Sequence, residues 1–82
     1  MERIFIKNLK KQLNETIKGD LFVHIIDDKL VVDIQPPGLW TWRYTLDNIR
    51  MNIATGLSST YVANVIVKKY KKYILLQHFH QK

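Results

Sequence analysis

The stretch that decides the fold is residues 58–79, SSTYVANVIVKKYKKYILLQHF. It is the longest helical pattern in the chain, and its most apolar and most basic segment. At about 100° per residue, one broad arc carries the apolar side chains of Val62, Ala63, Ile66, Val67, Tyr70, Tyr73 and Ile74. Ser58 or Ser59 stands where an N-cap belongs. We therefore predict a long helix whose apolar arc organises the core.

The N-terminal segment predicts a second amphipathic helix, over roughly residues 3–18. Its apolar side chains recur at spacings of three and four, at Ile6, Leu9, Leu13 and Ile17. Gly19 follows where a C-terminal cap belongs, and Lys18 in the last turn suits the helix dipole. The single apolar stripe indicates packing on one side only.

Two β-rich runs, 21–26 and 30–35, are joined by Asp27-Asp28-Lys29 and predict a hairpin. A turn on Asp27-Asp28 places all six apolar members of three pairs on one face: Ile25 with Leu30, Val23 with Val32, and Leu21 with Ile34. A shift of the strand pairing by one residue would instead place Val31 and Asp33 opposite the apolar side chains of the first strand. The other face then carries His24, Asp33 and Gln35 together with Phe22, Ile26 and Val31.

Pro36-Pro37-Gly38 ends the second strand. We predict a third strand over residues 39–45, with Trp40, Trp42 and Tyr44 on the side opposite Arg43. These aromatics suit either base stacking or the core, and we expect the core because no basic residue is interleaved with them. A short helix follows through Leu46, Ile49 and Ile53, capped by Thr45 or Asp47 and ending before Gly56. The expected fold is a single α+β domain over residues 1–82, ordered α-β-β-β-α-α.

Composition limits the class of protein. The 82 residues suffice for one domain, and no cysteine is present, which favours a reducing compartment. Apolar runs are far shorter than the roughly 20 residues that span a bilayer, and charge interrupts the N-terminus too early for a signal peptide. We expect a cytoplasmic protein with no membrane partner. The net charge is +6, and the positive charge is concentrated in the two terminal segments, which suits a polyanion as partner.

The outward arc of the long helix is the main candidate site. Lys68, Lys71 and Lys72 share it, with Lys69 at its boundary. Tyr61, Leu75 and Phe79 are interspersed, although a purely solvated face would not carry them. We hypothesise that the lysines bind nucleic acid, with Arg43 as a lesser candidate. The alternative is a protein interface through Tyr61, Leu75 and Phe79, in a homodimer or with a host protein. Other interpretations are a solvated lysine face, and Phe79 packing on the N-terminal helix.

Residues 56–65 match a helix-turn-helix only in part. Leu57, Val62 and Val65 follow Gly56 at suitable spacings. Asn52 and Thr55, however, stand where small and apolar residues are expected, and the start of the second helix is polar rather than basic. An ordinary helical hairpin is the better interpretation.

Catalytic and metal signals are weak. The pattern His78-x-His80 has no carboxylate or cysteine beside it. His24 can approach Asp33 on the hairpin, but no nucleophile accompanies them. Because glycine-rich phosphate loops and paired carboxylates are also missing from the sequence, we expect no enzyme, no catalytic residue, no metal, no cofactor and no small-molecule substrate.

The C-terminal half resembles small uncharacterised proteins of Gram-positive phages and prophages. The resemblance rests on Trp42-Arg43-Tyr44-Thr45, Gly56-Leu57-Ser58-Ser59 and Val67-Lys68-Lys69-Tyr70-Lys71-Lys72-Tyr73-Ile74-Leu75, with Ile49, Ile53, Val62-Ala63 and Phe79. It implies a bacterial cytoplasm, or a host cytoplasm during phage infection. No catalytic or binding residue is implied by it.

Overall fold

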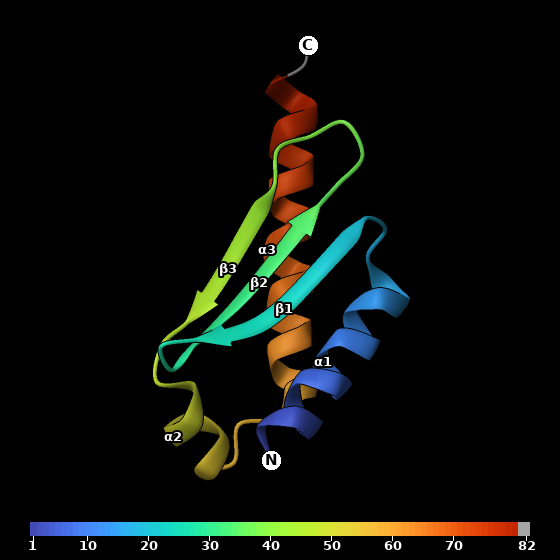
Figure 1. Cartoon of the computed structure of the whole chain (residues 1–82). Coiled ribbons are helices and arrows are strands. Elements are labelled where there is room, and N and C mark those ends of the chain that lie inside the picture. Colours follow the sequence, from blue (N-terminus) through green and yellow to red (C-terminus); the bar gives the residue numbers. More distant parts are fainter. Residues whose placement is uncertain (81–82) are drawn as a thin grey trace.

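The computed structural model describes residues 1–80, and a three-stranded antiparallel sheet carries all helical packing on one of its faces (Figure 1). The strand order is β1-β2-β3, so β2 is central and the other two are edges. The predicted α+β order α-β-β-β-α-α is confirmed. Its elements are α1 (Glu2–Thr16), β1 (Asp20–Ile26), β2 (Lys29–Gln35), β3 (Trp42–Leu46), α2 (Ile49–Ala54) and α3 (Ser59–His80).

The hairpin has the predicted register. Val23 pairs with Val32, and the flanking pairs are Leu21 with Ile34 and Ile25 with Leu30. Asp27 and Asp28 have φ angles of 50° and 57°. Positive φ at both central residues is the signature of a type I′ turn, whose twist matches that of the strands. The apolar face of β1 and β2 is therefore turned toward the helices.

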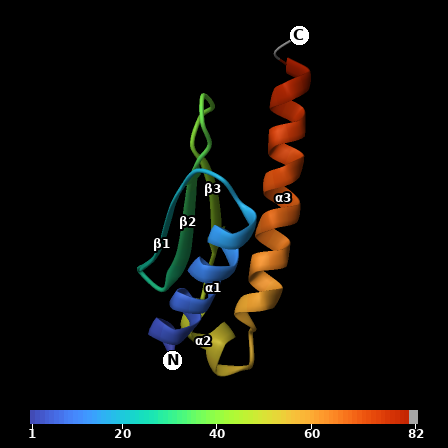
Figure 2. The same cartoon turned by 90° about the vertical axis from the view of Figure 1, so that its right-hand side faces the viewer.

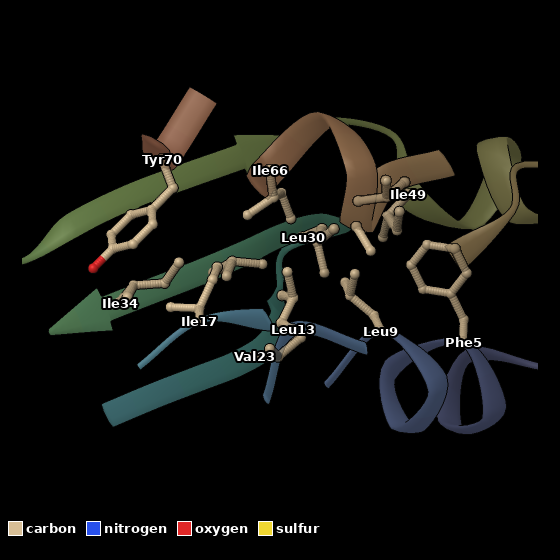
Figure 3. Close-up of a cluster of buried hydrophobic side chains, with 13 residues drawn as sticks. Phe5, Leu9, Leu13, Ile17, Val23, Leu30, Ile34, Ile49, Ile66 and Tyr70 are labelled. Atoms are coloured by element: carbon tan, nitrogen blue, oxygen red, sulfur yellow. The ribbon is translucent and has the colours of Figure 1, made fainter. Parts of the chain in front are cut away.

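The core forms where α1, α3 and the sheet converge (Figure 3). Burial of the side chains in this layer supplies most of the driving force for folding. The side chains with no exposed surface are those of Leu9, Leu13, Leu30, Val32, Ile34, Ile49 and Ile66. Val62, Ala63 and Tyr70 of α3 are also buried, and Val67, Tyr73 and Ile74 pack against them. The predicted apolar arc of α3 is thus confirmed.

The end of α1 differs from the prediction. The helix stops at Thr16, Ile17 is extended and buried, and Lys18 lies outside the last turn. Gly19 is not a helix cap, because its φ is +130° and a Cβ there would lie 2.6 Å from the carbonyl oxygen of Gln35. The chain must pass close to the end of β2 to enter the sheet, and only glycine fits that approach. Burial of Ile17 in an extended conformation ends the helix early.

The third strand is shorter than predicted, and the prediction that Trp40 lies in the core is wrong. β3 pairs with β2 only from Trp42 onward, and Trp40 is 84% exposed. The Gln35 amide donates to the carbonyl oxygen of Leu39 over 2.8 Å, which holds the connection away from the ladder. Without strand pairing, the alternation of side chains does not extend back to Trp40. Trp42 and Tyr44 are half-buried and do pack against the core.

The N-terminal ends of α2 and α3 are capped in different ways. α2 begins at Ile49 rather than at Leu46, which ends β3, and neither Thr45 nor Asp47 caps it. Asp28 does so from the hairpin turn: its carboxylate accepts from the backbone N–H of Arg50 over 3.0 Å, and its carbonyl accepts from that of Ile49. Asn48 precedes the helix in a left-handed conformation.

α3 is capped as predicted. The Ser58 hydroxyl accepts from the backbone N–H of Tyr61 over 3.0 Å, which satisfies one of the free donors at the helix start. Within the described residues, no helix has the length and apolarity needed to cross a membrane.

Candidate nucleic-acid interface

α3 is long because one side of it is a core element and the other side is free. Its inner side packs against α1 and the sheet through Val62, Ile66 and Tyr70. Its last turns extend past the sheet and the β2–β3 connection (Figure 2). The 22 residues of α3 therefore present a long outward surface with few neighbours.

Four lysines of α3 point away from the fold. Lys68, Lys69, Lys71 and Lys72 are all exposed. None of them makes an ion pair with a side chain that the structure describes, since the three ion pairs found involve Lys29, Arg43 and Arg50. Their ammonium groups are thus solvated and available. We use the name lysine ridge for Lys68, Lys71 and Lys72 with Tyr61, Leu75 and Phe79.

The apolar members of the lysine ridge are exposed as well. Tyr61 is 63%, Leu75 58% and Phe79 66% exposed. Packing of Phe79 on the N-terminal helix, one of the interpretations of the sequence, is wrong. The end of α1 at Thr16 faces α3 at the level of Tyr70 and Ile74, so α1 does not reach the last turns. The ridge therefore combines three cations with three uncovered apolar groups.

Arg43 does not belong to this surface. β3 places it on the sheet face opposite the helices, directly across from Asp33. Its Nε and Nη2 atoms donate to the two carboxylate oxygens of Asp33 over 2.7 and 2.9 Å. This bidentate hydrogen bond lowers the pKa of Asp33 and raises the pKa of Arg43. The structure brings the four lysines together but leaves Arg43 apart from them.

Charge is segregated between the helices and the rest of the molecule. Residues 1–18 and 59–80 carry nine of the thirteen lysines and arginines but only two of the seven acids. The five aspartates lie in the strands and turns, four of them in the hairpin and its turn and one beside Asn48. Positive potential therefore concentrates on the helical layer, where attraction of a polyanion requires no rearrangement.

A small hollow adjoins the ridge. It has a volume of about 380 Å³ and lies between the end of α1, the β2–β3 connection and α3. Lys18 and Lys71 stand at it, and the other lining side chains are mostly apolar: Thr16, Ile17, Pro36, Pro37, Leu39, Tyr70 and Ile74. Burial raises the pKa of the Tyr70 phenol, with a smaller effect from nearby Tyr73. Tyr70 thus acts as a packing residue at physiological pH.

The aromatic side chains beside the ridge form a structural cluster. Trp42 meets Tyr70 edge-on at a centroid distance of 5.6 Å and lies 6.5 Å from Tyr73. The Tyr73 hydroxyl donates to the carbonyl oxygen of Trp40 over 2.9 Å. These contacts attach the β2–β3 connection to α3, so the part of α3 that carries the lysines packs against the sheet.

The described histidine side chains, those of His24 and His78, lie in different parts of the fold. Among the side chains that the structure describes, no three histidine, cysteine, aspartate or glutamate residues gather as metal ligands. His78 is exposed, and the side chain of His80 lies outside the described part. Arg43 is the main cause of the lowered pKa of Asp33, and His24 adds a smaller electrostatic contribution.

Comparisons with protein-family models, curated proteins and solved structures give no match. The resemblance to phage proteins therefore stays a prediction.

Proposed function

We propose that this protein binds nucleic acid through the lysine ridge of α3. The observation that carries the proposal is the set of four exposed α3 lysines without an ion pair among the described residues, on a helix whose other side is locked in the core. A phosphate backbone is the polyanion that such a rigid row of ammonium groups suits best.

Charge density supports this partner. Lys68 to Lys72 spans roughly 6 Å of helix axis at 1.5 Å per residue. Duplex DNA carries one phosphate charge per about 1.7 Å of its axis. The lysines are therefore packed closely enough to contact several neighbouring phosphates at once, with release of the counterions that screen them.

The aromatic members of the ridge support contact with exposed bases. Tyr61 and Phe79 lie about 27 Å apart along α3, one on each side of the lysines. Bases of single strands stack on such side chains without strict sequence preference. The protein makes mainly phosphate contacts, so its binding is weakly sequence-specific and strongly dependent on salt.

Fluorescence anisotropy with labelled single-stranded and duplex oligonucleotides, repeated over a range of salt concentrations, tests the proposal. The slope of log K against log salt is negative, and we expect its magnitude to fall by about 2.7 for duplex and 2.1 for single strands in the variant Lys68→Gln/Lys71→Gln/Lys72→Gln. The reason is that each lysine removed leaves one phosphate unneutralised, so that binding releases fewer counterions from the nucleic acid.

A matched control separates the ridge from net charge. The variant Lys7→Gln/Lys10→Gln/Lys11→Gln removes the same charge from α1 and leaves α3 intact. We expect it to lose less affinity than the α3 variant. Equal losses, or no binding by the unmodified protein at low salt, would overturn the proposal.

A second candidate function is a protein interface, and a separate observation favours it. Leu75, Leu76 and Phe79 expose 58%, 48% and 66% of their surface on the free end of α3. Contiguous apolar surface of this kind marks interaction sites. Sedimentation at two concentrations tests self-association through this end: a sedimentation coefficient that rises with concentration supports a homodimer, and one that stays at the monomer value removes that branch.

A further inference from the structure

The free edge of β1 is unprotected. Within the described part of the chain, β1 pairs only with β2, in an unbroken register of seven pairs without a bulge (Figure 1). It contains no lysine and no proline, DLFVHII. Proteins commonly protect edge strands by shortness, bulges, lysine or proline. The other edge, β3, has five residues, includes Arg43 and follows the Pro36-Pro37-Gly38 connection. Only β1 offers a long template for another strand.

The turn determines which groups of β1 face outward. In a hairpin with a two-residue I′ turn, the closing pair exchanges both hydrogen bonds, and here that pair is Ile26 with Lys29. Hydrogen-bonded and non-bonded pairs alternate along an antiparallel ladder. The backbone groups of Phe22 and His24 are therefore used by β2. Those of Leu21, Val23 and Ile25 point away from the sheet.

A second copy of this chain does not fit the edge. α1 packs over β1 as its nearest helix (Figures 1 and 2). Pairing of two β1 strands about Val23 brings both copies of α1 to the same place above the joined strands. Packed helices need about 8–10 Å between their axes. A strand without a helix over it meets no such obstacle.

The flank of α1 above the free edge is basic. The Gln12 amide donates to the Ser59 hydroxyl and so faces α3. At about 100° per residue, Lys10 and Arg3 lie about 160° and 180° round the helix from Gln12. Both are exposed, and neither makes an ion pair with a described side chain. They overlook the path of an added strand from the helix side.

The outer face of the sheet supplies the complementary chemistry. Phe22 and Ile26 point there from β1 and are 58% and 53% exposed. We propose that the free edge of β1 binds an extended acidic peptide as a fourth strand. Its acidic side chains face Arg3 and Lys10, and its alternate, apolar side chains cover Phe22 and Ile26. Main-chain hydrogen bonds give affinity in this mode, and alternate side chains give selectivity.

Amide hydrogen exchange followed by NMR tests the proposal with a synthetic nine-residue peptide in which glutamate alternates with valine. We expect the peptide to slow exchange at the amides of Leu21, Val23 and Ile25. Those of Phe22 and His24, already bonded to β2, change little. The same peptide with lysine in place of glutamate should produce no protection. Failure of the glutamate peptide to protect the three outward amides at millimolar concentration overturns the proposal.

Charge reversal on α1 separates this edge from the lysine ridge. We expect Arg3→Glu/Lys10→Glu to lower peptide affinity at least about tenfold, since both charges then repel the glutamates. The matched variant Lys68→Glu/Lys72→Glu changes the net charge equally and should leave peptide affinity within about twofold. Equal losses in the two variants would show that net charge, and not the edge, binds the peptide. This inference is independent of nucleic-acid binding, which the α3 variant should weaken more than the α1 variant does.

Discussion

The outward side of α3 and the outward side of the sheet are both charged, yet they use their charges differently. On the sheet, Arg43 is fixed by both carboxylate oxygens of Asp33, and β2 begins with Lys29 in an ion pair to Asp47 at 3.6 Å. On α3, Lys68, Lys71 and Lys72 have no described ion-pair partner. Lys29 and Arg43 of the sheet each have an aspartate as ion-pair partner, whereas α3 contains no acidic residue.

This difference separates stability from recognition. Charges that pair within the protein fix its register and turns, and they are already partly neutralised. Unpaired ammonium groups repel one another weakly, and their electrostatic energy becomes more favourable when a polyanion binds. α3 therefore stabilises the fold with its inner side, and its outer side is the surface on which we propose that a partner binds.

The largest expected effect comes from breaking the packing between the two layers. Ile66 has no exposed surface, and Ile66→Ala should lower the free energy of unfolding by about 2–5 kcal/mol, because it removes buried methyl groups and leaves a cavity. Leu75→Ala, on the outer side of the same helix, should change it by less than about 0.5 kcal/mol. Urea unfolding measures both. Similar losses would contradict the division between the two sides of α3.

A smaller effect is expected where α3 holds the β2–β3 connection. Tyr73→Phe removes the hydrogen bond to the carbonyl oxygen of Trp40, at a cost of about 0.5–1.5 kcal/mol. Limited proteolysis should then cleave residues 36–41 faster. Tyr61→Phe serves as the control, since no hydrogen bond of its hydroxyl is found among the described residues, and it should leave both measurements unchanged. Equal cleavage rates in the two variants would mean that Tyr73 does not anchor the connection.

The paired charges of the sheet should give a pH dependence that the ridge lacks. The hydrogen bond from Arg43 lowers the pKa of Asp33 below its usual value. The resulting stability is fully present above the unfolded-state pKa of about 3.9, and it is lost as pH falls through the lower folded-state pKa. Thermal unfolding between pH 5 and pH 2 should therefore show a shallower acid destabilisation in Asp33→Asn. A profile that matches the unmodified protein would mean that Arg43 does not stabilise the folded state through Asp33.

The smallest effect has the opposite sign. Lys68 and Lys72 are four residues apart on α3 and repel each other, so Lys68→Gln/Lys72→Gln should stabilise the fold by about 0.2–0.5 kcal/mol at low salt. The gain should vanish at high salt, where the repulsion is screened. Thermal unfolding at two ionic strengths measures it. A loss of stability would instead assign the lysines a structural role.

Sequence periodicity predicted the sheet and α3 well because the relevant spacings are short-range. Alternation on both sides of Asp27-Asp28 left one register that gathers six apolar side chains on one face, and that register is observed. The apolar arc of α3 is likewise confirmed. Both patterns depend on the backbone geometry of a single element or hairpin.

The sequence failed where a distant segment decides the outcome. Trp40 continues the alternation of β3 but lies in a connection held by Gln35 and Tyr73. Gly19 follows a helix but is required by the carbonyl of Gln35. Asp28 stands in a turn, yet it also caps α2. An aspartate with spare carboxylate oxygens was a weak signal for such a cap, because its recipient is 22 residues away.

The sequence by itself determined the element order, the hairpin register, the inner side of α3 and the identity of its outward lysines, because local periodicity and turn chemistry are encoded in neighbouring residues. Only the tertiary structure decided that Arg43 lies apart from those lysines, that Phe79 is uncovered, and that α1 lies over β1 with its free edge open. The physical reason is that these features depend on where separate elements meet. The lengths of the helices, their crossing angles and the order of the layers determine those contacts, and the spacing of residues within one segment does not encode them.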